Sequence, residues 1–120
     1  MKILICDDAG FIRQILMDVI ATHGQHTIWE ARNGKEAVDI ATQVCPDVCF
    51  MDVVLPEQNG IEAARAIREQ CPQTKIFALS TLSQEDIETI KPLDTTFDHF
   101  IVKPFTPNQI IDLLNKGESL

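Results

Sequence analysis

The residues best suited to chemistry in this chain follow short apolar segments. Three carboxylates, one hydroxyl and one ammonium occupy such positions: Asp7 and Asp8 after the first segment, then Asp52, Ser80 and Lys103. Carboxylates hold hard cations and can act as nucleophiles, while hydroxyl and ammonium groups bind anionic oxygens. Each residue alone is ordinary at the end of a strand. Together they predict a single site, provided that the fold brings them to one place.

Carboxylates held close together repel one another, so either one of them is protonated or a cation neutralises the group. Ligation by oxygen alone favours Mg²⁺ over Zn²⁺. A calcium loop, with graded ligands inside about a dozen residues, does not occur in the sequence. A carboxylate can also carry a phosphoryl group as an acyl phosphate. We therefore expect Mg²⁺ as the cofactor and phosphoryl transfer to a carboxylate as the chemistry.

The elements that must position these residues alternate along the chain. The apolar runs lack polar alternation, which is typical of parallel strands covered on both faces; they lie at 3–6, 48–51, 76–79 and 100–102, with a weaker edge run at 27–29. Segments with helical spacing separate them. We predict an α/β fold, a single doubly wound sheet of five parallel strands flanked by five helices. Strand carboxyl ends share one edge of such a sheet, where sites lie.

Caps and prolines predict the ends of the helices. Gly24 indicates a left-handed end to the first helix, and Pro72 ends the third after Cys71. Asn33 marks the turn into the second helix. Thr106 and Gln109 form a capping box at the start of the last helix.

The fourth helix has the weakest pattern. Ser83 can cap a segment over 84–91, and Pro92 stops it. Residues 93–97 show no clear period. We expect a short helix followed by an irregular connection.

Length and composition limit the class of protein. The 120 residues predict one domain over 1–120, and 45% hydrophobic residues suffice for a core. The net charge of -8 repels nucleic acid and anionic lipid, so no direct nucleic-acid binding is expected. No apolar run is long enough for membrane insertion, and Asp7 interrupts any signal-peptide core. These features predict a cytoplasmic protein.

The four cysteines carry no recognisable motif. No Cys-x-x-Cys pair occurs, and Cys45 and Cys49 lack a second ligand pair for zinc. Cys6 and Cys49 lie inside apolar runs, and free Cys behaves as a small hydrophobe. We expect buried free thiols for these two and for Cys45 and Cys71.

Four ordered motifs resemble the CheY-like receiver domain of two-component response regulators. They are Cys6-Asp7-Asp8, the segment 51–56 with Gly60 after it, the segment 78–81 and the segment 100–104. The resemblance extends from about Lys2 to Leu114. It implies the flavodoxin-like strand order 2-1-3-4-5, which a chemotaxis member of this family has.

The resemblance also implies roles for the acids. Asp52 would accept a phosphoryl group from a histidine kinase or a phosphotransfer protein. Asp8, Asp52 and the backbone carbonyl of Val54 would hold Mg²⁺, and Asp7 would assist through water. The domain would catalyse only its own phosphorylation and dephosphorylation, so it would not be an enzyme in the usual sense.

A switch is implied as well. Lys103 would bind a phosphoryl oxygen, and its peptide bond to Pro104 would be cis. Ser80, where threonine is commoner, would move toward the phosphate, and Phe100 would rotate inward. A downstream protein would bind the face made by the fourth helix, fifth strand and fifth helix. Residues 94–97 replace the usual Gly-Ala pair, which changes that face.

Two alternatives remain open at this point. The chain could be the excised receiver of a longer DNA-binding regulator or hybrid kinase. It could instead be a small Mg²⁺-dependent aspartyl phosphatase, although such enzymes favour Asp-x-Asp and Val54 occupies the second acid position here. A metal site at His23 and His26 is disfavoured because Gly24 interrupts the helix between them.

Overall fold

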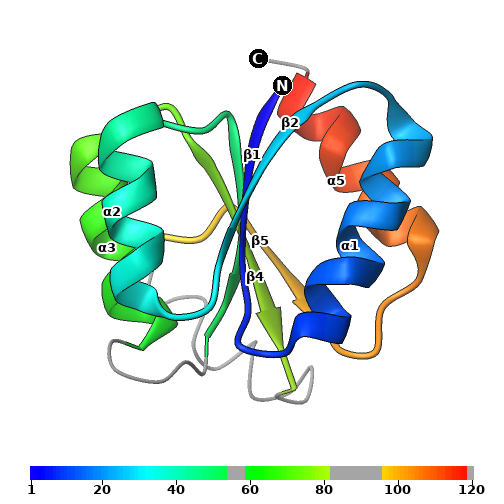
Figure 1. Cartoon of the computed structure of the whole chain (residues 1–120), viewed down its shortest axis with the longest axis horizontal. Helices are drawn as coiled ribbons and strands as arrows, with labels where there is room; N and C mark the ends of the chain where they lie inside the picture. Colours follow the sequence, from blue (N-terminus) through cyan, green and yellow to red (C-terminus); the bar gives the residue numbers. More distant parts are fainter. Residues whose placement is uncertain (54–58, 82–95, 119–120) are drawn as a thin grey trace.

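The computed structural model describes residues 1–53, 59–81 and 96–118 (Figure 1). A single parallel sheet lies at the centre, in the order β2-β1-β3-β4-β5. Its strands are β1 (Lys2–Cys6), β2 (Thr27–Ala31), β3 (Val48–Asp52), β4 (Lys75–Ser80) and β5 (His99–Val102). The predicted α/β class and strand order are confirmed.

Helices cover both faces of the sheet (Figure 1). On one face lie α2 (Gly34–Val44) and α3 (Gly60–Gln70), and on the other lie α1 (Gly10–His23) and α5 (Pro107–Glu118). The described residues therefore contain four of the five expected helices. The expected helix over 84–91 lies outside the described residues.

Two apolar clusters fill the space between the sheet and the helices. Because successive side chains of a strand point to opposite faces, Leu4 and Cys6 pack toward α2 and α3, whereas Ile3 and Ile5 pack toward α1 and α5. All five residues of β3 are buried. Burial on both faces explains why the strand sequences show no polar alternation.

Most predicted helix boundaries are confirmed. Asn33 Oδ1 accepts the backbone N–H of Glu36 at 2.9 Å, so this side chain caps α2. At the start of α5, the Thr106 N–H donates to Gln109 Oε1 at 2.8 Å, and the Gln109 N–H donates to Thr106 Oγ1 at 3.3 Å. This reciprocal pair is the predicted capping box.

The predicted left-handed end at Gly24 is wrong. Gly24 has φ 162° and ψ -168°, which is extended backbone, because the chain continues directly toward β2. The left-handed helix end occurs instead at Cys45, with φ 43°, after α2.

The expectation for the cysteines is half correct. Cys6 and Cys49 are free and buried, as predicted. Cys45 and Cys71 instead form a disulfide across the ends of α2 and α3, with their Cα atoms 5.5 Å apart. Sequence separation hid this pairing because it depends on how the two helices pack.

Helix α1 carries apolar residues outside the core. Phe11 is 70% exposed and Ile15 is 45% exposed, although helical spacing places Ile15 with the core residues. Leu16, Val19 and Ile20 cover the sheet as predicted. No helix among the described residues has the length and apolar character that crossing a membrane requires.

Candidate functional site

Three acidic side chains meet at the carboxyl edge of the sheet. Cys6 pairs with Met51 in the parallel ladder, so Asp7, just after β1, and Asp52, the last residue of β3, lie at the same level. One carboxylate oxygen from each of Asp7, Asp8 and Asp52 lies within 4.8 Å of the others. Asp7 and Asp52 are buried, at 0% and 7% exposure, and Asp8 is exposed. The fold therefore brings together the acids that the sequence separates.

Lys103 reaches two of these acids from the end of β5. Its Nζ donates to Asp7 Oδ2 at 2.6 Å and to Asp52 Oδ2 at 3.3 Å. Burial of the ammonium lowers its pKa, but the hydrogen bond from Lys103 to Asp7 and the charge of Asp52 outweigh burial and raise that pKa above its usual value. Lys103 is consequently cationic at neutral pH.

The acidic cluster carries a net negative charge that a cation can neutralise. In their ionised forms, Asp7, Asp8 and Asp52 carry three negative charges, and Lys103 supplies one positive charge. Two negative charges remain, and the available donors are oxygens within 4.8 Å of one another. This donor set and charge fit a hard divalent ion such as Mg²⁺.

Local hydrogen bonds fix the position of Asp7. Its Oδ1 accepts the Ala9 N–H at 2.9 Å, and its own N–H donates to the Ala31 carbonyl at 3.1 Å. Arg13 Nη1 donates to the Asp7 carbonyl at 2.7 Å, while its Nε pairs with Glu30 at 2.8 Å. No sequence motif marks Arg13 as a positioning residue, because its partner at the site is a backbone oxygen.

Gly60 allows α3 to begin against the end of β3. A Cβ atom at Gly60 would lie 1.9 Å from the Asp52 carbonyl oxygen and 2.7 Å from the Val53 Cα. Neither backbone atom can yield without moving the acidic residue. Only glycine permits this close approach, which sets the depth at which Asp52 lies.

The remaining expected site residues lie around the acids. Ser80 ends β4 and is 1% exposed, and its carbonyl accepts the Lys103 N–H at 2.7 Å. The Lys103–Pro104 peptide bond is cis. Phe100 is half-buried, with its ring centroid 5.3 Å from that of Phe97. Val54 lies outside the described residues.

The sequence profile of the response regulator receiver domain matches residues 3–115. The chain belongs to this family. Receiver domains bind Mg²⁺ at an acidic pocket, and Asp7, Asp8 and Asp52 form a group that could hold a metal ion. Membership of the family also implies interaction with histidine kinases and downstream targets.

Chemotaxis proteins are among the similar curated sequences. The receiver domain is 39% identical over 115 residues to the chemotaxis protein CheY of Thermotoga maritima, covering 96% of this chain and 95% of that protein. It is 34% identical over 115 residues to CheY of Bacillus subtilis, with the same coverage of both. A protein-glutamate methylesterase of Archaeoglobus fulgidus is 32% identical, and the match covers 34% of its length.

Solved structures show the same architecture. The response regulator domain of Thermotoga maritima CheB superimposes with a TM-score of 0.81 at 33% identity, covering 99% of this chain and 94% of that one. Vibrio cholerae CheY4 superimposes with a TM-score of 0.84 at 28% identity, covering 97% of each chain. The likeness extends over the whole sheet and both helical layers.

Proposed function

We propose that Asp52 is the phosphoacceptor of this receiver domain and that a phosphohistidine is the donor. An Asp52 carboxylate oxygen attacks the phosphorus, the nitrogen–phosphorus bond breaks, and its electron pair stays on the departing imidazole. The observation that carries this proposal is the meeting of Asp7, Asp8 and Asp52 with Lys103 at one edge of the sheet.

The neighbours of Asp52 have distinct roles in this scheme. Asp8, Asp52 and the Val54 carbonyl would ligate Mg²⁺, and Asp7 would assist through water. The ion, when bound, supplies positive charge that screens the incoming phosphoryl oxygens from the acids. Lys103 Nζ lies 2.6 Å from Asp7 Oδ2 and 3.3 Å from Asp52 Oδ2. The shorter bond anchors the ammonium on Asp7, and Asp52 keeps the weaker contact.

Phosphorylation would reorganise the far side of the site. The phosphoryl group adds about -1.5 to -2 charge and three strong acceptor oxygens. Lys103 would bind one oxygen, and Ser80 would move to donate to another. Phe100 would then turn inward. The surface of β5, α5 and the helix expected over 84–91 would thereby change its affinity for a downstream protein.

The domain itself would be a signalling module in the cytoplasm, with no activity beyond its own phosphorylation and dephosphorylation. The net charge of -8 supports recognition of a protein instead of nucleic acid. Similarity to CheY is compatible with a single-domain regulator. The methylesterase match supports the alternative of a receiver cut from a longer protein.

Intact mass after incubation with Mg²⁺ and acetyl phosphate tests the proposal. Wild type should gain one phosphoryl group, and Asp52→Asn should gain none. Asp39→Asn, which removes an exposed acid on α2, is the matched control and should behave as wild type. Labelling of Asp52→Asn would refute the assignment. Continuous phosphate release without any accumulated adduct would indicate a phosphatase.

A further inference from the structure

The disulfide lies far from the acidic site. Cys45 follows α2 and Cys71 follows α3, so both lie where the chain enters the amino ends of β3 and β4 (Figure 1). Asp52 lies at the carboxyl end of β3, and Gly60 lies at the amino end of α3. Each is therefore at the end of its element that is opposite to the disulfide. The disulfide plays no part in the chemistry described above.

Cys45 occupies a backbone conformation that disfavours it. Its φ of 43° and ψ of 78° lie in the left-handed region, where a Cβ is costly and helices usually end in glycine. It is the one non-glycine residue with positive φ among those described. The side chain gains nothing from the core, since Cys45 is exposed. Its bond to Cys71 is the contact that offsets this cost.

Other bonds hold the two cysteines together independently of the disulfide. Thr74 Oγ1 donates to the Pro46 carbonyl at 2.6 Å, and the Lys75 N–H donates to the Asp47 carbonyl at 2.9 Å. Arg68 Nη1 donates to the Thr74 carbonyl at 2.6 Å. The first two bonds join the segment after α2 to the segment after α3, and the third holds the latter segment against α3. A reduced chain would consequently keep both thiols within reach of each other.

Accessibility separates the four cysteines. Cys45 is exposed, whereas Cys71 is 3% exposed and lies just beneath it. Both line a surface pocket of about 220 Å³ between the two segments. Cys6 and Cys49 are fully buried, and burial raises the pKa of both thiols, that of Cys49 to about 12. A reagent in solution therefore meets Cys45 first.

We propose that Cys45 and Cys71 form a thiol–disulfide exchange site that reacts reversibly with small disulfides and dithiols. The Cys45 thiolate attacks a small disulfide, forming a mixed disulfide and releasing one thiol. The Cys71 thiolate then attacks the Cys45 sulfur, forming the internal bond and releasing the second thiol. A dithiol reverses both steps by attacking Cys45. The receiver domain is folded in both forms.

The cross-link changes stability more than structure. The bond joins residues 26 apart, a span that contains all of β3 and α3. Constraining the unfolded chain in this way should raise Tm by about 10 °C over the reduced form. The size of this shift reports whether the bond closes in solution.

Oxidised glutathione, followed by alkylation and intact mass, tests the site on the reduced chain. Wild type should lose two hydrogens, and after denaturation only Cys6 and Cys49 should be alkylated. Dithiothreitol should restore four thiols without loss of the circular dichroism of the folded protein. A wild type that keeps four thiols would overturn the proposal, as would unfolding on reduction.

Single variants test the order of attack. Cys71→Ser should keep one glutathione adduct on Cys45, because no second thiol can displace it. Cys45→Gly relieves the left-handed backbone, so it should fold well and gain no adduct. An adduct on Cys71, Cys6 or Cys49 in Cys45→Gly would contradict the assignment of Cys45 as the entry point. Asp52→Asn should react as wild type, so the result does not depend on the phosphoacceptor.

Discussion

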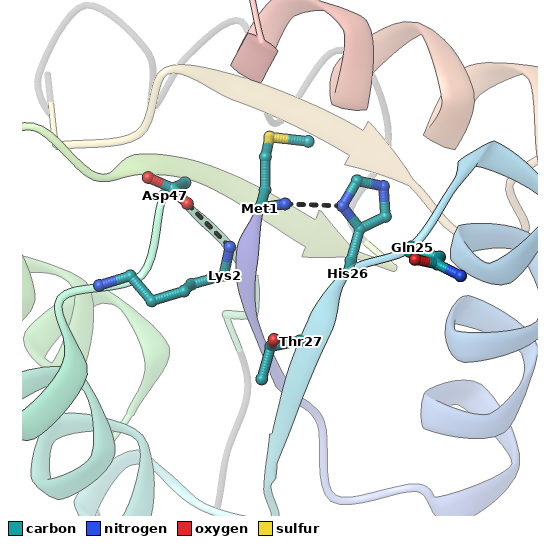
Figure 2. A pocket seen from close by; sticks show the side chains of 6 residues that line it. All are labelled: Met1, Lys2, Gln25, His26, Thr27 and Asp47. Atoms are coloured by element: carbon teal, nitrogen blue, oxygen red, sulfur yellow. Dashed lines mark hydrogen bonds between the residues drawn. The ribbon is translucent and has the colours of Figure 1, made fainter.

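The polar groups at the two ends of the sheet differ in how far they are paired. At the carboxyl end, three acids lie within 4.8 Å of one another, and the Lys103 ammonium pairs with two of them. At the amino end, donors and acceptors are matched. The Met1 ammonium and the His26 ring face each other, and the Lys2 N–H donates to Asp47 (Figure 2). The Met1 N–His26 Nδ1 distance is 2.9 Å, and the Lys2 N–Asp47 Oδ2 distance is 2.7 Å.

At the amino end, a series of hydrogen bonds runs from His26 to residues of α1 and α5. The His26 Nε2 and His23 Nδ1 atoms lie 2.9 Å apart, and His23 Nε2 lies 2.9 Å from Asn115 Oδ1. If the ammonium donates to His26 Nδ1, each ring in turn can donate from its Nε2. This chain joins β1 to α1 and α5. The open pocket of about 420 Å³ beside it is lined by the two hydrogen-bonded pairs drawn in Figure 2, together with Gln25 and Thr27.

The difference indicates that the polar groups at the amino end stabilise the fold and that the acids at the carboxyl end serve a ligand or a reaction. Groups that satisfy one another hold elements in place, as the histidines do. Like charges held together without enough counter-charge cost stability, and a fold that keeps them does so for a ligand or a reaction. Removing an acid at the carboxyl end should therefore weaken metal binding and raise stability without the metal, whereas removing a polar partner at the amino end should lower stability and leave metal binding unchanged.

The largest expected effect comes from filling the space at Gly60. Gly60→Ala places a Cβ 1.9 Å from the Asp52 carbonyl, so the backbone must shift, at a cost of about 2 to 3 kcal/mol in the free energy of unfolding. Phosphorylation should fall with it. Gly10→Ala is the control, since its Cβ would lie 3.6 Å from the Arg13 side chain. Urea denaturation measures the free energy of unfolding of both variants. Equal values for Gly60→Ala and Gly10→Ala would contradict the close approach of Gly60 to Asp52.

Removing one acid should separate metal binding from stability. Asp8→Asn should weaken Mg²⁺ binding by roughly tenfold or more, measured by calorimetry. Without Mg²⁺, the same change should raise Tm by ~3 °C, because it relieves repulsion among the acids.

Asp47→Asn is the matched control at the amino end. It should leave Mg²⁺ affinity unchanged and lower Tm, since Asp47 accepts the Lys2 N–H. Should Asp8→Asn lower Tm without Mg²⁺, the acids would not be repelling one another.

Breaking the histidine chain should affect stability alone. His26→Ala removes the partner of the Met1 ammonium and of His23, at a cost of about 1 kcal/mol. Phosphorylation by acetyl phosphate should proceed at the wild-type rate. A changed rate would show that the amino end communicates with the acidic site.

The smallest effect is a pH dependence at Cys49. Burial raises the pKa of this thiol to about 12, so the unfolded chain loses its proton first as pH rises. The stabilisation is complete below the unfolded pKa of about 8.5 and declines as pH rises toward 12. From pH 8 to pH 9, wild type should lose about 0.7 kcal/mol more than Cys49→Ala in the free energy of unfolding. Parallel pH profiles of the free energy of unfolding for wild type and Cys49→Ala would contradict this prediction.

Much of the architecture followed from local pattern. Strand sequences without polar alternation, such as Val48–Asp52, predicted a sheet covered on both faces, and that burial is observed. The capping box at Thr106 and Gln109 is confirmed because it needs only neighbouring residues. Asp7, Asp8 and Asp52 could be expected together because parallel strands end at one edge. Their roles in phosphorylation stay predictions.

Tertiary packing decided what local pattern could not. The Cys45–Cys71 bond, the approach of Gly60 to Asp52 and the contact of Arg13 with the Asp7 carbonyl all join elements whose spacing depends on how helices pack. The exposure of Phe11 reflects the same limit, since α1 turns it away from the sheet. Sequence periodicity determines which face of an element is apolar. Which residues of two elements touch depends on the distance and angle between them, and only the folded chain sets these.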